Sequence, residues 1–165
     1  MKSLNPKSYI LNSRMGFTLI ELIIVVSITA LLFSMGFLKL LDYRQRQALN
    51  LTKQSIVAVL RNAQDRSISQ ESGVRWGVHF ENPTGVANDF YELFSGASYN
   101  PSNVVSKNNL DPEIQFNDPV AGVPKNVIFS PMTGASTLTY INISLVSDTS
   151  VSSTIIINTN GQIQY

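Results

Sequence analysis

A long apolar run near the N-terminus, interrupted by a single charge, restricts what this chain can fold into more than any other feature. From Phe17 to Leu38 there are 22 residues, of which only Glu21 is charged. As an α-helix with a rise of about 1.5 Å per residue they would extend roughly 33 Å, enough to cross the hydrocarbon core of a bilayer. The run therefore predicts a membrane-spanning helix.

Glu21 lies inside this run, where a carboxylate is expensive. It costs on the order of 2.5 to 3.5 kcal/mol on insertion scales, so such a residue normally has a polar partner or a function. The nearest basic residues are Arg14 and Lys39, and neither lies one helical turn from Glu21. We predict that its partner belongs to another molecule. The alternative is an acid near the membrane interface that the helix dipole favours.

Length and charge exclude several classes of protein. The chain has 165 residues, which suits one ordinary domain plus an anchor. Three of the twelve basic residues precede the apolar run, so the rest of the chain carries nine basic and eleven acidic residues, a net charge of −2. This argues against a strongly basic nucleic-acid binder. The absence of cysteine excludes disulfides, thiolate metal sites and a cysteine nucleophile.

The residues before the apolar run, 1–16, are polar and carry a positive excess without any acid. Such a flank favours the cytoplasmic side of a membrane, which would place the C-terminal part outside the cytoplasm. No small-residue cleavage site follows the run, as it would in an ordinary secretory signal. Any cleavage is expected before the run, at Gly16, so that the anchor remains in the mature protein.

The residues at the start of the run carry a specific resemblance. Behind a short basic leader and ahead of a long apolar helix stands Gly16-Phe17-Thr18-Leu19-Ile20-Glu21-Leu22. This stretch resembles the type IV prepilin family, which includes the type II secretion pseudopilins. The resemblance implies that a membrane peptidase cuts after Gly16 and that Phe17 becomes N-methylated. It also implies that Glu21 pairs with the N-terminal amine of an adjacent subunit.

Two features depart from the family pattern. Leu38 stands where many major pilins have a helix-kinking proline, although Gly36 could loosen the helix nearby. The last basic residue of the leader is Arg14 rather than the residue next to Gly16. The missing proline favours a minor subunit over a major one.

Helical periodicity continues beyond the membrane segment. Apolar residues recur at spacings of three to five, at Ala48, Leu51, Ile56, Val59, Leu60 and Ala63. We expect one helix from about Phe17 to Ser69, whose outer half requires a sheet to pack on. The expected organisation is a leader at 1–16, a membrane and filament-core helix at 17–41, the outer half of that helix at 42–70, and a β-rich globular domain at 71–165.

The rest of the chain is typical of strands and turns. Strands are expected at 74–80, 90–94, 114–116, 127–129, 138–145, 154–159 and 162–165, with most of 95–127 as loop. Asn160-Gly161 predicts a two-residue hairpin turn because both residues tolerate positive φ. The fold class is therefore α+β, pilin-like, with a long N-terminal helix on an antiparallel sheet. A weaker resemblance covers the order of Arg-rich helix end, Trp-containing strand, Phe-Ser-Pro-x-x-Gly turn and terminal hairpin. It points to H-type minor pseudopilins or their pilus counterparts.

Three groups of side chains are candidates for catalysis, calcium binding or DNA binding. His79 is the single histidine and lies in an expected strand without a catalytic partner, so a structural role is favoured. A solvated acidic loop is preferred over a calcium site for Asp111, Glu113, Asn117 and Asp118, whose spacing fits no EF-hand. A weak basic patch for DNA is conceivable at Arg61, Arg66 and Arg75, but no Lys or Arg follows Lys125. Trp76 is expected to be a core anchor.

The leading hypothesis is a non-enzymatic subunit of a type IV pilus or type II secretion pseudopilus. It needs no cofactor and no metal. The expected partners are other pilin or pseudopilin subunits, the prepilin peptidase and methyltransferase, and an inner-membrane assembly platform. The protein would cross the inner membrane once, with the leader in the cytoplasm, and then enter the filament. The alternatives are a minor pilin that binds DNA for uptake and an anchored extracytoplasmic binding module that does not polymerise.

Overall fold

The computed structural model describes residues 16–85 and 88–165. The expected leader, except for Gly16, lies outside the described residues. The chain divides into two compact units, residues 1–40 and residues 41–165, and each is described by itself. The second unit contains both sheets and the hydrophobic core.

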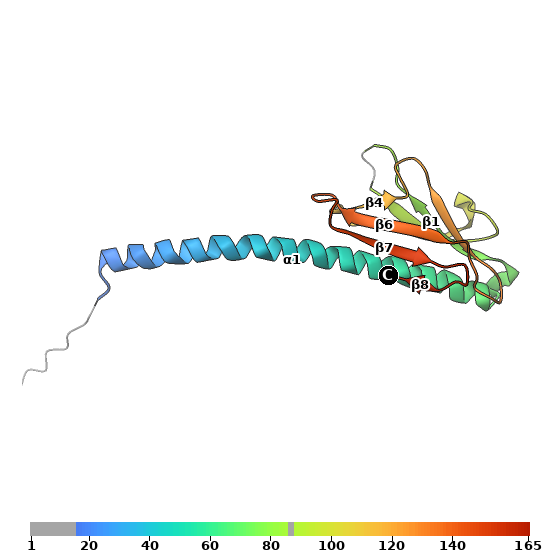
Figure 1. Ribbon diagram of the computed structural model, residues 1–165, viewed down its shortest axis with the longest axis horizontal. Coiled ribbons are helices and arrows are strands. Elements are labelled where there is room, and N and C mark those ends of the chain that lie inside the picture. The colour runs from blue at the N-terminus through green and yellow to red at the C-terminus, as the bar shows by residue number, and fades with distance from the viewer. Residues whose placement is uncertain (1–15, 86–87) are drawn as a thin grey trace, which may run out of the picture. The chain divides into compact units, whose positions relative to one another are not determined.

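The helix α1 comprises Leu19–Ile68, 50 residues without a proline, as the sequence predicted to within two residues at each end (Figure 1). Its start is set by Thr18, whose hydroxyl accepts a hydrogen bond from the backbone N–H of Glu21 at 3.2 Å. Thr18-Leu19-Ile20-Glu21 has the spacing of a capping box, in which a Thr side chain satisfies a free N–H of the first turn. The chain therefore has a local reason to begin its helix directly after Phe17.

Eight strands form two antiparallel sheets of four. The first contains β1 (Trp76–Glu81), β2 (Phe90–Ser95), β3 (Val104–Asn109) and β5 (Lys125–Phe129) in the order β3-β2-β1-β5. Short 3₁₀ turns, η1 (Glu71–Gly73) and η2 (Pro101–Asn103), precede β1 and β3.

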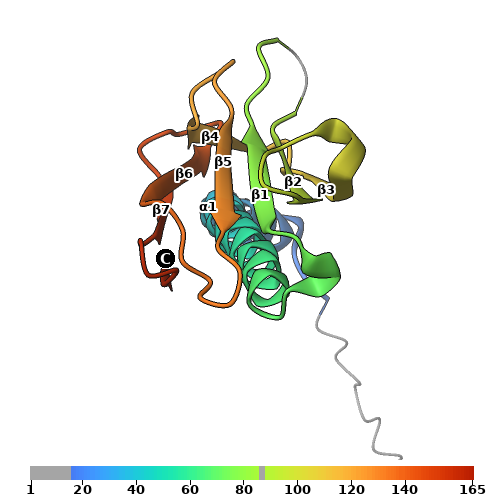
Figure 2. The ribbon, with the colours of Figure 1, turned by 90° about the vertical axis from the view of Figure 1, so that its right-hand side faces the viewer.

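The second sheet has the order β4-β6-β7-β8. Its strands are β4 (Ile114–Asp118), β6 (Thr139–Leu145), β7 (Ser152–Ile157) and β8 (Ile163–Gln164). Figure 2 looks along the helix and shows the two sheets on either side of it. The sequence predicted a single antiparallel sheet; the division arises because β4 pairs with β6 rather than with β3, its neighbour in the chain.

The core lies where the outer half of α1 meets the inner faces of both sheets. The helix contributes one buried stripe, Leu49, Ile56, Val57, Leu60 and Ala63, and Ile56, Leu60 and Ala63 are 0% exposed. The sheets contribute fully buried residues that include Val78, Phe80, Val127, Phe129, Ile141, Ile143, Ile155 and Ile157. This confirms the prediction that the outer half packs on a sheet. Leu51 is an exception, 55% exposed, because it faces away from the stripe.

Two polar side chains near the end of α1 connect the helix to both sheets. The hydroxyl of Ser67 accepts a hydrogen bond from the N–H of Trp76 at 2.8 Å and can donate to the carbonyl of Phe129 at 3.2 Å. Gln64 donates from Nε2 to the carbonyls of Gly134 at 3.0 Å and Gly161 at 2.8 Å. The helix is therefore held in register by hydrogen bonds as well as by apolar contact.

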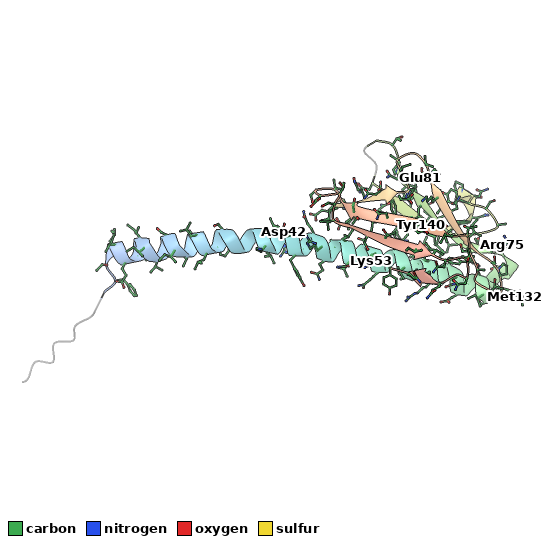
Figure 3. The ribbon with its side chains drawn as sticks, in the orientation of Figure 1. Asp42, Lys53, Arg75, Glu81, Met132 and Tyr140 are labelled. Atoms are coloured by element: carbon green, nitrogen blue, oxygen red, sulfur yellow. The ribbon has the colours of Figure 1, made fainter. Side chains whose placement is uncertain are left out.

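Two local predictions were wrong, the loop at 95–127 and the type of the terminal turn. The region expected to be mostly loop contains β3, an edge strand so polar that no alternating pattern marks it. In β6, Ile141, Ile143, Ser144 and Leu145 are buried, whereas Tyr140, labelled in Figure 3, is 46% exposed. Ile141, Ile143 and Leu145 thus form the core face of this strand.

The terminal hairpin forms, but its turn differs from the expected one. The N–H of Gly161 bonds to the carbonyl of Asn158, and the N–H of Asn158 bonds to the carbonyl of Gln162. Gly161 has φ +84°, while Asn160 is not in the positive-φ region. The connection is therefore a longer turn that needs one glycine rather than a two-residue turn with two positive φ values.

Replacement of Ser67 by alanine tests the polar connection between helix and sheet. Ser67→Ala leaves the buried N–H of Trp76 without a partner, so we expect a loss of about 1 to 3 kcal/mol in the free energy of unfolding. The measurement is urea unfolding of the full chain in detergent, followed by the fluorescence of its one tryptophan. Ser69→Ala is the matched control, because Ser69 is exposed and bonds only to the adjacent helical turn. Equal stability of the two variants would contradict the assignment.

Candidate functional site

The segment before α1 is open. Residues 16–18 have no regular secondary structure and are exposed, with Phe17 82% exposed. A Cβ atom added to Gly16 would meet nothing within 4 Å. The bond between Gly16 and Phe17 therefore lies in an accessible, non-helical segment, which is the form of chain that a peptidase can bind.

Glu21 lies in the first turn of α1, with its side chain exposed. Within the described residues it makes no salt bridge, and Arg14 lies outside them. Thr18 already serves the backbone N–H of Glu21, so the carboxylate itself is not used in that contact. The geometry leaves the carboxylate available to a group from another molecule.

The described part of the first unit exposes an apolar surface. Every side chain described in residues 16–34 and 39–40 is exposed, including Leu19 at 76% and Phe33 at 77%. The embedded hydroxyls bond back to the carbonyls of the preceding helical turn, as for Ser27 to Ile23 at 2.7 Å and Thr29 to Val25 at 2.9 Å. A helix in hydrocarbon must satisfy its polar groups internally in this way. Within the described residues, α1 is the one helix that is long enough and apolar enough to cross a membrane.

His79 is 2% exposed and takes part in a polar cluster on β1. Its Nδ1 lies 2.7 Å from Oδ1 of Asn126 and its Nε2 lies 2.8 Å from Oε2 of Glu81. Tyr99 stacks on the ring, with the centroids 3.6 Å apart and the planes at 7°. Both nitrogens are engaged and the ring is covered, so His79 fixes the loop that carries Tyr99 onto the sheet.

Tyr99 closes this cluster through its hydroxyl. The phenol donates a hydrogen bond to Oε2 of Glu92 at 2.6 Å, and Lys107 lies 3.4 Å from the other oxygen of that carboxylate. Burial, followed by the hydrogen bond to Glu92, raises the pKa of Tyr99 to about 12. Nothing in the sequence pattern brings Tyr99, Glu92 and His79 together, because β2 and the loop after it carry no catalytic or metal-binding spacing.

The four residues weighed for calcium do not converge. Asp111 caps the N–H of Glu113 at 2.9 Å, and Asp118 forms an ion pair with Lys125. Asn117 uses both ends of its amide, donating to Asn142 and accepting from Ser144. Among residues 16–85 and 88–165 there is no group of three or more His, Asp or Glu that could hold a metal ion.

The three arginines weighed for DNA have different surroundings. Arg66 pairs with Glu71 at 3.1 Å and stacks on Trp76, while Arg61 lies over the ring of Tyr165. Trp76 is 4% exposed and donates from its indole to the carbonyl of Glu71 at 3.1 Å, which confirms it as a core anchor. Two of the three guanidinium groups are thus occupied by side chains of the same domain.

Comparison with known proteins covers both the N-terminal motif and the fold. Residues 12–37 match the family described as the prokaryotic N-terminal methylation motif. No curated protein sequence matches the chain. Two crystal structures of the type IV minor pilin FimU of Pseudomonas aeruginosa resemble it, with TM-scores of 0.51 and 0.54. They are 16% and 15% identical to the chain, and the alignments cover 70% and 74% of it and 90% of each FimU chain.

The chain therefore combines the prokaryotic N-terminal methylation motif in residues 12–37, a long exposed apolar helix and an α+β fold that resembles that of FimU. The fold confirms the expected α+β, pilin-like fold class.

The hydrogen bond of Tyr99 predicts a pH dependence. Because the pKa of Tyr99 is raised from 10.0 to about 12, its stabilising contribution is fully present below pH 10.0 and is lost as the pH rises through about 12. Tyr99→Phe should cost about 1.5 to 3 kcal/mol at neutral pH, as expected for a hydrogen bond to a carboxylate. The difference from the wild type should shrink above pH 10.0.

The measurement is urea unfolding at a series of pH values between neutrality and strong alkali. Tyr140→Phe is the control, because the Tyr140 hydroxyl makes no hydrogen bond within the described part of the chain and the side chain is 46% exposed. A Tyr99→Phe penalty that stays constant across the alkaline range would show that the phenol proton does not contribute.

Proposed function

We propose that this protein is a non-enzymatic filament subunit, cut after Gly16, N-methylated at Phe17 and assembled through its apolar helix into a type IV pilus or type II secretion pseudopilus. One observation carries the proposal: Glu21, a carboxylate without a salt bridge among residues 16–85 and 88–165, lies in the first helical turn directly after an exposed, non-helical Gly16–Phe17 bond. Removal of the leader creates a positively charged amine at Phe17, which can pair with the carboxylate of Glu21 in a neighbouring subunit.

The pairing is between subunits. An α-amine has a pKa of about 8 and is mostly charged at neutral pH. In an apolar environment its attraction to a carboxylate is much stronger than in water, and this attraction offsets part of the cost of burying both charges. Glu21 of one subunit and the amine of Phe17 of its neighbour would fix the stagger between successive helices. The carboxylate therefore has no partner until the leader is removed from an adjacent chain.

The exposed helix supplies the rest of the assembly surface. In lipid, apolar side chains gain little from mere contact with each other, so helices associate by close packing and by polar pairs. Residues 17–41 would leave the bilayer together and become the filament core, with 42–70 and the β-rich domain at 71–165 on the outside. The partners would be other pilin or pseudopilin subunits, the prepilin peptidase and methyltransferase, and an inner-membrane assembly platform.

The location follows from the same residues. The basic leader would remain in the cytoplasm, residues 17–41 would cross the inner membrane once, and the globular domain would lie outside the cytoplasm before assembly. A minor subunit, of the H type or its pilus counterpart, is favoured by the resemblance to the fold of FimU and by Leu38 in place of a proline.

Processing is tested by the mass of the mature protein. We expect the purified membrane form to begin at Phe17 and to carry one additional methyl group on its amine. Intact-mass and N-terminal peptide mass spectrometry measure both changes at once. An N-terminus at Met1, or a cut far beyond Gly16, would favour an anchored binding module that does not polymerise.

The pairing is tested by removing the carboxylate. Glu21→Ala should leave folding and processing intact and should reduce incorporation into filaments by at least about tenfold, since an unpaired charge in the core costs more than 1.4 kcal/mol. The measurement is the fraction of processed chain recovered in sheared filaments. Ser27→Ala is the control, because Ser27 lies in the same helix and bonds only to Ile23. Normal incorporation of Glu21→Ala would reject the proposed pair.

A further inference from the structure

A polar hollow lies where the outer half of α1 meets the β6–β7 turn. It has a volume of about 330 Å³, and all of the residues that line it belong to the second unit. The helix contributes Asp42, Gln45 and Arg46, and the sheet contributes Leu145, Ser147, Asp148 and Val151. Asp42, labelled in Figure 3, marks its place on the helix. The volume is within the range of small-ligand sites.

The hollow holds charges of both signs that are not paired with each other. Among the described residues, none of Asp42, Arg46 and Asp148 makes a salt bridge. Hydrogen bonds from the side chain and backbone of Ser150 lower the pKa of Asp148, and the charge of Arg46 adds a smaller effect. The site therefore presents a guanidinium group and two carboxylates around an apolar floor of Leu145 and Val151.

Hydrogen bonds within the β6–β7 turn, and from the turn to α1, fix the position of Asp148 beside the helix. Oδ1 of Asp148 accepts hydrogen bonds from the N–H of Ser150 at 3.0 Å and from its hydroxyl at 2.6 Å. Ser147 donates to the side chain of Gln45 at 3.4 Å, which attaches the turn to the helix. The second oxygen of Asp148 has no hydrogen-bond partner within the described residues.

The sequence of α1 indicates where the hollow lies relative to the membrane. The uncharged run ends at Lys39, and Asp42 to Arg46 follow Leu40 and Leu41 directly. At about 1.5 Å per residue these side chains extend roughly 5 to 10 Å beyond Lys39 along the helix. The headgroup layer on each side of a bilayer is about 5 to 7 Å thick. If residues 17–41 span the membrane, as the proposed function requires, the hollow lies at headgroup depth.

We propose that this hollow binds the headgroup of a zwitterionic phospholipid with a primary ammonium group, phosphatidylethanolamine. The guanidinium of Arg46 binds the phosphate, as Arg does elsewhere through a planar, charge-assisted contact. Asp42 and Asp148 accept hydrogen bonds from the ammonium. Phosphatidylcholine has no N–H to donate and phosphatidylglycerol has no cation, so neither satisfies both halves of the site. The bound lipid holds the globular domain against the membrane before assembly.

The test uses the full chain in nanodiscs of phosphatidylcholine, with or without phosphatidylethanolamine or phosphatidylglycerol. Hydrogen exchange is measured at the backbone amides of residues 146–151. We expect exchange about threefold slower with phosphatidylethanolamine than in the other discs, which corresponds to two-thirds occupancy by mass action. Equal exchange in all three discs would overturn the proposal, as would equal slowing with phosphatidylglycerol.

Two arginine variants distinguish binding in the hollow from a general effect of surface charge. Arg46→Gln should abolish the slowing, whereas Arg44→Gln should retain it, because Arg44 has the same charge at the same depth but does not line the hollow. Unchanged exchange in β1 verifies that each variant is folded. Loss of the slowing in both variants would show a non-specific electrostatic effect and would overturn the site.

Two further arms identify the source of the ligand and separate this proposal from the proposed function. Free phosphoethanolamine is added to phosphatidylcholine discs as a soluble form of the same headgroup. We expect it to slow exchange less than phosphatidylethanolamine in the disc does. Equal slowing by the two would overturn the lipid as the ligand. Failure of the chain to co-purify with any disc would reject the membrane anchoring. Insertion without lipid-dependent exchange would reject only the headgroup site.

Discussion

The globular domain depends on the burial of one stripe of α1 between two sheets. Ile56, Leu60 and Ala63 are 0% exposed and lie against strands from both sheets. Each fully buried Leu or Ile contributes about 1.5 to 3 kcal/mol relative to its exposed state, so the helix is the largest single contributor to a core that neither sheet completes alone. Without the helix, the inner faces of both sheets would be exposed to water.

Hydrogen bonds at the end of the helix turn this apolar contact into a defined register. A stripe of aliphatic side chains tolerates small slips along the helix axis, because apolar attraction has no direction. Ser67 and Gln64 do not tolerate them, since each must meet fixed backbone groups of β1, β5 and the turns around Gly134 and Gly161. Gly161 has to be glycine at this point, because a Cβ atom there would clash with the carbonyl oxygen of Gly134.

Much of this could be read from the sequence, and the exceptions have physical causes. The helix, the Trp76 strand and the terminal hairpin were predictable because each has a strong local signal. The strand β3 was not, because it is a polar edge strand whose pairing with β2 is decided by tertiary contacts. The separation into two sheets was also hidden, since sequence periodicity indicates which residues are buried but not which strand lies beside which. In the candidate site, the motif alone pointed to Gly16, Phe17 and Glu21, whereas the cluster around His79 depends on a loop folding over the sheet.

The start of α1 shows why Glu21 is suited to an intermolecular role. In a complete capping box the acid at the third helical position turns back to the backbone N–H of the capping residue. Here Thr18 makes its half of that contact, at 3.2 Å to the N–H of Glu21, and no hydrogen bond from the Glu21 side chain completes the other half in the described residues. The helix start is thus secured by the threonine hydroxyl, and the carboxylate is not needed for it. A side chain whose charge is costly in a membrane and is not required by its own helix fits the proposed pairing with the N-terminal amine of a neighbouring chain.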